Sequence, residues 1–575
     1  MNILGLNYGG HDTSACITIN GKVVAACEEE RYDYIKHSRN FPIGAINDCL
    51  KIAKLKIKDI DLISFSNDPY LQIREKYIKL ATDDNNRVDF LINEFDRIKK
   101  LSETEDFIRK KIKYKKKIEF NEHHLCHLAS TFYPSGFKKS LIVSYDGIGE
   151  IHSALFAIGN KNKIKVIHQD NKYPDSLGLF YSAVTFYLGW NIFCDEGIIM
   201  GLAPYGDSKE KLKNSNKRYI DFFREIIKID KKDPLKYLIN KEWIDYHKIK
   251  DKWISKKFVK TFGRKRNPGS VISLHHKNIA AALQDRLEEV VLYQLKLLKK
   301  NNNLDYLCIS GGVGLNCSLN GKIEKSKLFK EIFIQPASGD AGVSYGSCLH
   351  SHAKHFKNFR FKKHHDFNLG SRSNKKDILS ILKNKKMSFT DYKEKIYVKT
   401  AQLISEGKIV GWYQGATEFG PRALGNRSIL CKPFPEKMRD HINKNVKFRE
   451  YFRPFAPSIL EEDLHNYFTI NQSSPHMLIA CNVKKNKKKS IPATVHVDNT
   501  CRAQSVSKNL NLKFWNLINE FKKITGIPVL LNTSFNIKGQ PIVNNPQDAI
   551  DCFKKYRIDY LVMDSILVKK NKLSK

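Results

Sequence analysis

The stretch NILGLNYGGHDTSACITINGKVVAACEEE, residues 2–30, predicts the fold of the first part of the chain. It contains an apolar strand, a glycine-rich turn, a second apolar strand, a two-residue turn at Asn20-Gly21 and a third strand. The same plan returns over residues 140–170, in SLIVSYDGIGE, IHSALFAIG and KIKVIHQD. Each copy places a glycine-rich turn with an aspartate between two apolar strands. Such a duplication indicates a two-lobed α/β fold with a nucleotide in the cleft.

The remainder of the chain predicts a long helix and a second α/β domain. Apolar residues at helical spacing predict a helix between 277 and 300, and LDYLCISGGVGLN (304–316) predicts a buried strand that ends in glycines. A chain of 575 residues is too long for one hydrophobic core. We therefore expect a first domain over residues 1–352, a basic linker over 353–385 and a second domain over 386–568.

Composition excludes several classes of protein. The chain has no stretch of about 18 apolar residues, so we expect no transmembrane helix and no membrane partner. The first residues lack a basic segment followed by an apolar one, so we expect no signal peptide and a cytoplasmic protein. The twelve cysteines occur singly, with no C-x-x-C pair. This argues against a zinc ribbon and against a disulfide framework.

The net charge is strongly positive, because 99 Lys and Arg against 60 Asp and Glu give 99 − 60 = +39. Basic clusters occur at 109–117, 256–268, 354–365 and 484–489, and two of them contain aromatic residues that could stack on bases. One interpretation is a compositional bias with solvated lysines. The other is a polyanionic partner such as nucleic acid. Composition alone slightly favours the first.

The segment EHHLCHLAS (122–130) contains a candidate metal-binding pair. On a helix, His123 and His127 share one face, because residues i and i+4 are neighbours. Two histidines alone are weak evidence, since such pairs often pack or face water. A transition metal needs further ligands, and Asp146 and Asp340, each at the end of an apolar strand, are the candidates. A set of two histidines and two carboxylates suits Fe(II), Mn(II) or Zn(II).

Two further kinds of site are indicated. Glycines in SGGVGLN (310–316) allow close approach of a nucleotide, although a tight strand–helix turn explains them equally well. In the second domain, cations lie among Phe and Pro with few acids nearby, which favours a compact anion site over structural ion pairs. These residues, with one asparagine, are Arg422, Lys447, Arg449, Arg453, Arg502 and Asn532.

Eleven segments together resemble the O-carbamoyltransferases of the NodU, CmcH and TobZ type, in the family's order. They are GHDTSA, EEERYDYIKHSRNFP, HHLCHLASTFY, SYDGIGE, SLGLFYSAVTFYLG, MGLAPYG, SGGVGLN, SGDAG, EFGPRALGNRSIL, VKFREYFRPFAPSIL and LNTSFN. The resemblance implies a first domain of the actin/sugar-kinase (ASKHA) fold and a second similar to threonylcarbamoyl-adenylate synthase (YrdC). It also implies that carbamoyl phosphate and ATP yield carbamoyl-adenylate in the second domain, and that an acceptor hydroxyl attacks this intermediate in the first.

The resemblance also assigns roles to residues. It implies an iron(II) ion, which holds the adenylate phosphate, on His123, His127, Asp146 and Asp340. It implies Mg²⁺ with ATP, and His11 as the acceptor-side general base. The nucleotide-binding residues would be Lys36, Gly147, Gly311, Gly312 and Asn316. Carbamoyl phosphate and ATP would be held by Arg422, Lys447, Arg449, Arg453, Arg502 and Asn532. Ile198 departs from the family, which has lysine there, and His124 receives no role.

No motif names the acceptor or determines the oligomeric state. The charge motivates the hypothesis of a hydroxymethylated base in DNA, such as 5-hydroxymethylcytosine. The alternative is a hydroxyl of a sugar, an oligosaccharide or an antibiotic-like small molecule. A non-catalytic ATP-binding or nucleic-acid-binding scaffold is a third hypothesis, which the complete His, Asp and Arg motifs disfavour.

Overall fold

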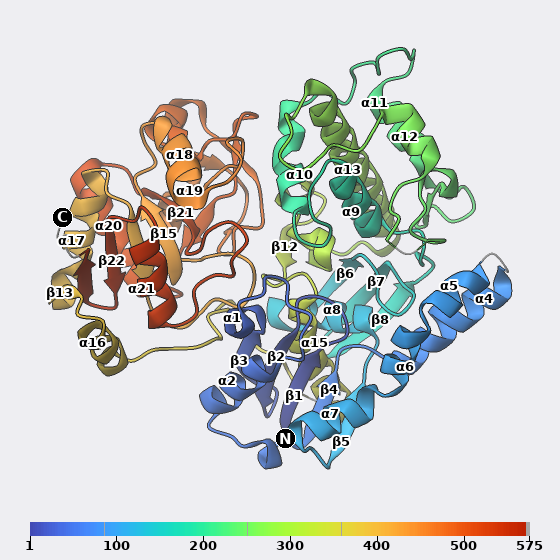
Figure 1. The fold of residues 1–575 in the computed structure, drawn as a ribbon, viewed down its shortest axis with the longest axis horizontal. Helices are drawn as coiled ribbons and strands as arrows, with labels where there is room; N and C mark the ends of the chain where they lie inside the picture. The colour runs from blue at the N-terminus through green and yellow to red at the C-terminus, as the bar shows by residue number, and fades with distance from the viewer. Residues whose placement is uncertain (85–86, 250, 358, 571–575) are drawn as a thin grey trace. The chain divides into compact units, whose positions relative to one another are not determined.

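The computed structural model describes residues 1–84, 87–249, 251–357 and 359–570. The chain divides into two compact units, and Figure 1 shows the elements of both. Unit 1 contains residues 1–25 and 39–364, and unit 2 contains residues 26–38 and the chain from 365 onward. Among the helices of the described residues, none is both long and apolar enough to cross a membrane.

The first sheet of unit 1 has the strand order β3-β2-β1-β4-β5. Its strands are β1 (Asn2–Asn7), β2 (Ser14–Ile19), β3 (Lys22–Glu28), β4 (Leu62–Phe65) and β5 (Lys117–Phe120). β1 pairs antiparallel with β2 and parallel with β4, and β4 pairs parallel with β5. The central strands are buried on both faces, as their continuous apolar sequences require.

The second sheet repeats this connectivity, with the order β12-β11-β6-β7-β8. Its strands are β6 (Lys139–Tyr145), β7 (Ala154–Asn160), β8 (Lys163–His168), β11 (Tyr306–Ser310) and β12 (Glu331–Ile334). β6 pairs antiparallel with β7 and parallel with β11, and β11 pairs parallel with β12. The predicted internal duplication is therefore confirmed.

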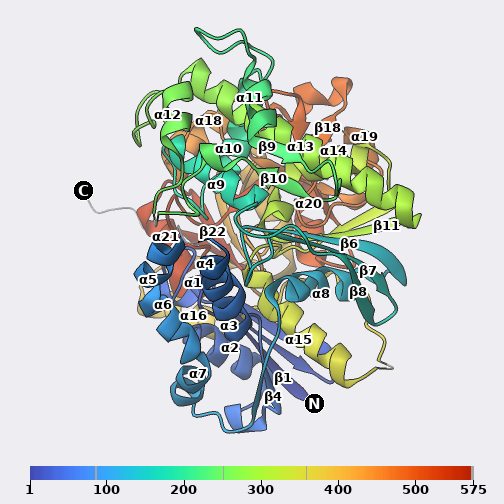
Figure 2. The ribbon, with the colours of Figure 1, turned by 90° about the vertical axis from the view of Figure 1, so that its right-hand side faces the viewer.

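One helix follows the last strand of each sheet. α8 (His123–Ser135) follows β5, and α15 (Ala341–His355) follows β12. The two helices lie side by side in Figure 1 and Figure 2. They approach closely because Gly346 has no side chain: a Cβ there would lie 1.9 Å from the carbonyl oxygen of Cys126. The long helix predicted over 277–300 is α13 (Leu274–Asn302).

Unit 2 is built on an eight-stranded sheet of order β13-β23-β22-β14-β15-β21-β16-β20. The strands are β13 (Ser388–Asp391), β14 (Val410–Tyr413), β15 (Arg427–Cys431), β16 (Ala456–Leu460), β20 (Gln504–Val506), β21 (Val529–Ser534), β22 (Tyr560–Met563) and β23 (Ile566–Lys569). Neighbouring residues along a strand enter different apolar clusters: Trp412 packs in one and Tyr413 in the other. Both faces of the sheet are therefore covered.

The segment 26–38 groups with unit 2, through contacts that its sequence alone does not reveal. Arg31 donates to the carboxylate of Glu28 and to the carbonyl oxygen of Gly420, and the Gly420 N–H donates back to Glu28. Within the range predicted as a linker, the structure has α16 (Lys375–Asn384). The domain limits 1–352, 353–385 and 386–568 remain a prediction. All twelve cysteines are free thiols, as expected.

Candidate functional site

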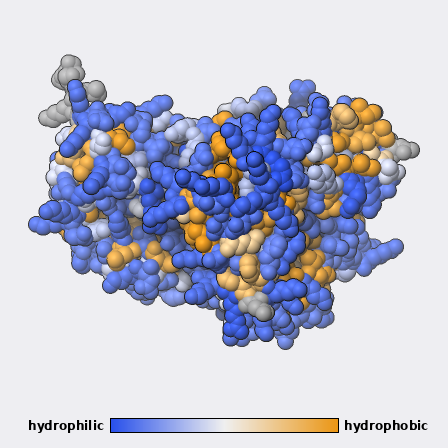
Figure 3. Space-filling view, turned by 90° about the horizontal axis from the view of Figure 1, so that it is seen from below, coloured by the Kyte–Doolittle hydropathy of each residue, from blue (hydrophilic) through white to orange (hydrophobic). Residues whose placement is uncertain are grey.

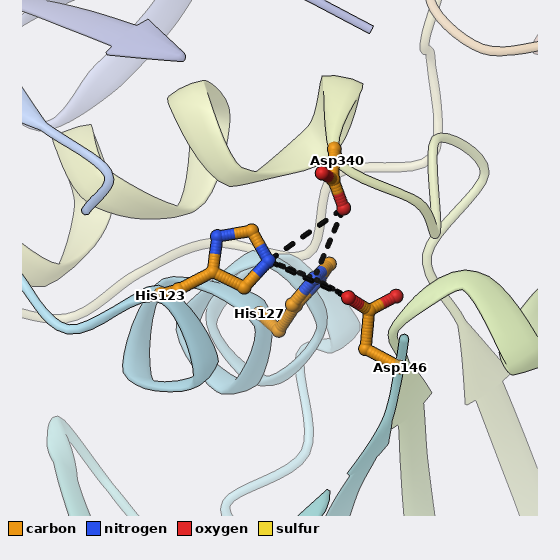
Figure 4. A group of neighbouring side chains, drawn as sticks. All are labelled: His123, His127, Asp146 and Asp340. Atoms are coloured by element: carbon orange, nitrogen blue, oxygen red, sulfur yellow. Dashed lines mark hydrogen bonds and ion pairs between the residues drawn. The ribbon is translucent and has the colours of Figure 1, made fainter. Parts of the chain in front are cut away.

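Unit 1 brings together the four predicted metal ligands, all of them buried (Figure 4). His123 and His127 lie on the first turns of α8. Asp146 follows the last residue of β6, and Asp340 directly precedes α15. The four candidate ligands thus come from segments that follow strands of both sheets. There the apolar sequence of the strand ends and polar residues begin.

The donor atoms have the spacing that one ion requires. The Nε2 atoms of His123 and His127 are 3.1 Å apart, and the Nε2 of His123 lies 3.6 Å from one oxygen each of Asp146 and Asp340. The Nε2 of His127 lies 3.9 Å from the same two oxygens. Four donors about 2.1 Å from a common ion in tetrahedral geometry would be about 3.4 Å apart. The residues present therefore fit a divalent transition metal.

The pKa shifts of the residues in this cluster also favour a bound divalent ion. Burial lowers the pKa of His123, but Asp340 and Asp146 outweigh burial and raise it well above its ordinary value. Burial and the neighbouring His123 lower the pKa of His127 to about 4. Against burial, His123 and His127 hold the pKa of Asp146 far below its usual range. Two buried carboxylates beside two buried histidines call for a compact positive charge, which a divalent ion supplies.

His11 lies at the edge of this cluster. Its Nδ1 is 2.9 Å from the carboxylate of Asp12, and its Nε2 is 3.7 Å from Asp340. Burial lowers the pKa of His11, but Asp340 and Asp12 together raise it to about 9. Asp12 therefore orients the ring so that Nε2 points towards the metal ligand. The ring also stacks on Phe193, with centroids 5.1 Å apart.

His124, which has no role by sequence, is held away from the cluster. Its Nδ1 is 2.7 Å from the hydroxyl of Ser144, and its Nε2 is 2.9 Å from the carbonyl oxygen of His152. A carbonyl only accepts, so Nε2 carries the proton and the Ser144 hydroxyl donates to Nδ1. Both nitrogens are occupied, and burial with the charges of the neighbouring histidines lowers its pKa well below the ordinary value. His124 is a structural residue.

The glycine turns lie beside the candidate metal ligands. The N–H of Gly312 donates to Asp146 at 2.6 Å. Gly311 has φ of 85°, and a Cβ there would lie 2.1 Å from the carbonyl oxygen of Tyr145, so no other residue fits. Asn316 caps the helix that follows, α14 (Cys317–Lys325), and its side chain also bonds Gln284. Gly147 directly follows Asp146, so this part of the predicted nucleotide set converges on one edge.

Lys36 lies elsewhere, in the segment that belongs to unit 2. There its charge contributes to lowering the pKa of Lys447, together with Arg449 and Arg453. Lys36 therefore lies among the cations of unit 2. Its role in binding the nucleotide remains a prediction.

Unit 2 gathers most of the predicted cations. Burial and the charges of Arg449 and Arg453 lower the pKa of Lys447 well below its usual range, and burial with Arg453 and Arg502 does the same for Arg449. Lys447 donates to the carbonyl oxygens of Ser534 and Asn536. These cations lie close enough together in the interior to repel one another, which indicates a site that binds an anion.

Arg422 and Asn532, two other residues predicted to bind carbamoyl phosphate and ATP, lie near each other in unit 2. Arg422 precedes Ala423, whose carbonyl oxygen accepts a hydrogen bond from the side chain of Asn532. Asn532 also donates to Ser458 and Gln504 and is almost fully buried. These hydrogen bonds hold the neighbouring strands and the turn together.

Sequence reasoning missed Glu150. Its carboxylate is buried and accepts hydrogen bonds from the backbone N–H groups of His123 and Asp68. It therefore holds the start of α8, and with it the first histidine. The motif SYDGIGE contained this glutamate, four residues after Asp146. Ile198 is buried in α10 (Glu196–Leu202).

Comparison with known proteins decides the family. The sequence family described as Carbamoyltransferase N-terminus matches residues 2–349, and the one described as Carbamoyltransferase C-terminus matches residues 401–570. The chain belongs to the carbamoyltransferase family. This carbamoyltransferase is 34% identical to the nodulation protein NolNO of Sinorhizobium fredii, over 98% of its own chain and 80% of that protein. It is 31% identical to nodulation protein U of Rhizobium tropici, over 53% of its chain and 52% of that protein.

Solved structures provide more distant likenesses. The carbamoyltransferase is similar to full-length HypF in its phosphate- and nucleotide-bound form, with 14% identity, a TM-score of 0.36, and coverage of 61% of this chain and 55% of that one. It is also similar to the ROK hexokinase of Thermus thermophilus, with 11% identity, a TM-score of 0.27, and coverage of 61% and 98%. The enzyme class rests on the family matches, which confirm the predicted resemblance.

Proposed function

We propose that this carbamoyltransferase is an ATP-dependent O-carbamoyltransferase with two successive sites. In unit 2, water hydrolyses carbamoyl phosphate to carbamate and phosphate. Carbamate then attacks the α-phosphate of ATP, so that pyrophosphate leaves. In unit 1, an acceptor hydroxyl attacks the carbonyl carbon of carbamoyl-adenylate, AMP leaves, and the hydroxyl proton passes to a base. The buried two-histidine, two-aspartate cluster beside a glycine turn carries this proposal.

The chain's own residues supply most of the chemistry in unit 1. A divalent ion on His123, His127, Asp146 and Asp340 would act as a Lewis acid at the adenylate phosphate. We propose iron(II) as that ion, and the donor set also accommodates Mn(II) and Zn(II). The N–H of Gly312 bonds Asp146 and fixes the nucleotide-side turn to the same carboxylate. Mg²⁺ would accompany ATP.

His11 is the proposed base on the acceptor side. Asp12 holds its Nδ1, which leaves Nε2 directed towards the cluster. Without a cation to offset the charges of Asp340 and Asp12, His11 is protonated at neutral pH, because its pKa is about 9. A cation held by Asp340 would offset that carboxylate's charge and would lower the pKa of His11 towards the range that a base needs.

The cations of unit 2 are proposed to hold carbamoyl phosphate and the phosphates of ATP. The set is Lys36, Arg422, Lys447, Arg449, Arg453 and Arg502. Their mutual repulsion, seen in the lowered pKa values of Lys447 and Arg449, is relieved when an anion binds. Asn532 positions the turn that contains Arg422.

The fold assignments support this division of labour. The two sheets of unit 1 share one strand order, which is the duplication that an actin/sugar-kinase fold contains. We infer that fold for unit 1. The mixed eight-stranded sheet of unit 2, with a cationic cluster against it, supports the inference of a threonylcarbamoyl-adenylate synthase-like domain.

Contacts of the basic clusters bear on the choice between the two acceptor hypotheses, a modified base in DNA and a sugar or small-molecule hydroxyl. The face in Figure 3 is largely hydrophilic. Of the aromatic residues in the basic clusters, Phe356 is exposed, but several others are engaged within the protein. Phe258 and Phe262 are buried, and Phe361 packs on Tyr133 with centroids 4.2 Å apart. Several cations of the clusters form ion pairs within the chain, such as Arg109 with Glu105. These observations favour a hydroxyl of a sugar, an oligosaccharide or another small molecule.

The hydroxymethylated base in DNA is the second candidate, and only the net charge favours it. If DNA is the acceptor, labelled carbamoyl groups appear on 5-hydroxymethylcytosine DNA at low salt, and added salt suppresses the reaction. Absence of turnover at low salt, or indifference to salt, removes this candidate. The same screen with sugars and oligosaccharides tests the favoured class.

A half-reaction experiment tests the proposed function itself. Carbamoyl phosphate should stimulate release of pyrophosphate from ATP without any acceptor. In the Lys447→Met variant this release should fall about 10- to 100-fold, since a charged hydrogen bond to phosphate is lost, while metal content stays unchanged. Pyrophosphate release that is independent of carbamoyl phosphate would disprove the adenylation step, and unchanged release in Lys447→Met would remove that residue from it.

A further inference from the structure

A second group of buried cations lies in unit 1, apart from the metal cluster. Lys76, on the π-helical segment η2 (Ile73–Lys79), is 7% exposed, and Arg87, directly before α5 (Val88–Asn93), is 5% exposed. The Nζ of Lys76 and the Cζ of Arg87 both lie 5.3 Å from the ring centroid of Tyr173. Two cations therefore share one aromatic ring in the interior, where an unpaired charge is costly.

Several polar atoms in this group lack a hydrogen-bond partner among the described residues. They are Nε and Nη2 of Arg87, the hydroxyl oxygen of Tyr77, and both ring nitrogens of His247. All three side chains are more than nine-tenths buried. Native interiors contain few such atoms, because each costs free energy unless a ligand or a water satisfies it. Their concentration around two cations indicates a place prepared for an acceptor of hydrogen bonds.

The group formed by Lys76, Arg87 and their neighbours contains more positive than negative charges. Burial and the charge of Arg97 lower the pKa of Lys76 to about 7, Glu94 acts in the opposite direction, and Arg87 adds to the lowering. Glu94 lies 4.0 Å from Arg97. One carboxylate thus faces three cations. The further neighbours of His247 are Lys241, Lys248 and Asp245, so this side of the group adds positive charge as well.

One hydrogen-bonded loop connects the group to the metal cluster. The N–H of Tyr173 donates to the carbonyl oxygen of Ile151. The adjacent Glu150 accepts from the N–H of His123 and from that of Asp68, which caps the helix leading into η2. Tyr173, the ring shared by Lys76 and Arg87, is therefore hydrogen-bonded to the loop that orders the start of α8.

We propose that Lys76 and Arg87, with Tyr77, Tyr173 and His247, bind an anionic group of the hydroxyl acceptor: a carboxylate, a phosphate or a sulfate. Arg87 and Tyr77 donate hydrogen bonds to its oxygens, and Lys76 supplies charge. The assignment of the anion to the acceptor rests on the proposed O-carbamoyltransfer. The binding site itself does not, since it follows from the buried donors alone.

Binding is tested with the full chain and sulfate as the probe. Sodium sulfate and sodium phosphate should raise the melting temperature above that in sodium chloride of equal ionic strength. In Lys76→Met and in Arg87→Gln the affinity for sulfate should fall about tenfold or more, as expected for the loss of a charged hydrogen-bond donor. The matched control is Arg74→Gln, on the same segment and 69% exposed, which should bind like the parent.

Two outcomes would overturn the site. One is that sulfate and phosphate stabilise the parent no more than chloride does. The other is that both variants fold and still bind sulfate with the parent's affinity, which would make Lys76 and Arg87 packing residues. If Arg87→Gln does not fold, Lys76→Met and Arg87→Lys decide the matter: the first should weaken binding, and the second should retain part of it.

The acceptor is tested with matched neutral and anionic sugars. Labelled carbamoyl transfer is measured to glucose, glucuronate and glucose 6-phosphate. The anionic sugars should show a kcat/KM at least about tenfold higher, and this preference should vanish in Lys76→Met. Turnover of glucose alone, of all three equally, or of none overturns the assignment of the anion to the acceptor. Pyrophosphate release distinguishes failure of the proposed function from failure of the anionic-acceptor assignment. If the parent releases no pyrophosphate, the proposed function is rejected, but the sulfate-binding result is unaffected.

Discussion

The two sheets of unit 1 share one topology but differ in the groups at equivalent places. The hairpin turn after β1 contains His11 and Asp12, whereas the turn after β6 begins with Asp146. The helix after β5 starts with His123, whereas the helix after β12 is preceded by Asp340. Each half therefore places polar groups at the same two positions, one at a turn and one at a helix start.

The difference between the halves shows how a duplicated frame becomes an asymmetric site. The first half supplies nitrogen donors and a base, and the second supplies carboxylates. The proposed anion site follows the same rule: Lys76 and Arg87 come from the insertion between β4 and β5, and Tyr173 and His247 from the insertion between β8 and β11. Neither half contains a complete site.

The largest expected effect comes from removing one metal ligand from either half. His127→Ala and Asp340→Asn should each reduce carbamoyl transfer on the order of 10³-fold, as loss of a main electrostatic contributor does. Both should lose bound metal, measured by elemental analysis, while carbamoyl-phosphate-dependent pyrophosphate release stays unchanged. Chelation of the parent should have the same effect. Transfer that survives chelation would disprove the metal's role, and survival in one variant only would end the equivalence of the halves.

A smaller effect is expected at the turn of the first half. His11→Ala should slow transfer about 10²-fold, the low end of the range for loss of a general base, but the protein should keep its metal. Asp146→Asn, at the equivalent turn of the second half, should lose both. The comparison requires transfer rates and metal content measured on the same preparations. A metal-free His11→Ala protein would make His11 a ligand instead of a base.

The packing of α8 against α15 gives a prediction on stability. Gly346→Ala should destabilise the protein by about 1–3 kcal/mol, the usual cost of overpacking, because the added carbon meets the backbone oxygen of Cys126. Gly197→Ala is the matched control: its added carbon has no atom within 4 Å, and helix propensity favours alanine by up to about 1 kcal/mol. Chemical denaturation measures both. Equal stabilities would show that the helices can separate at no cost.

The last prediction is a pH dependence of stability due to Lys76, whose effect is spread over several pH units. Its pKa is about 7 in the folded chain and 10.5 ordinarily, so the unfolded chain binds more protons between these values. Stability relative to Lys76→Met should therefore rise with pH from about 7 to 10, by at most about 1.4 kcal/mol per unit. Denaturation in chloride buffers across this range measures it. A flat difference would show that Lys76 keeps its proton throughout.

Part of the site could be predicted from the sequence because the chemistry is local. His123 and His127 are one helical turn apart, and Asp146 and Asp340 end apolar strands, where side chains emerge at a sheet edge. The duplication was visible because each copy combines two strands with a short turn. Glu150 was missed because its role depends on the backbone of a helix distant in sequence.

By itself the sequence determined the strand–turn–strand units, the long helix, the free cysteines and the family, since these depend on neighbouring residues and short motifs. The tertiary structure alone decided that the four donors converge, that His124 is structural, and that Phe258 and Phe262 of one basic cluster are buried. It also decided that residues 26–38 belong with unit 2. These outcomes depend on which segments pack together, and packing is a property of the whole chain that spacing does not encode.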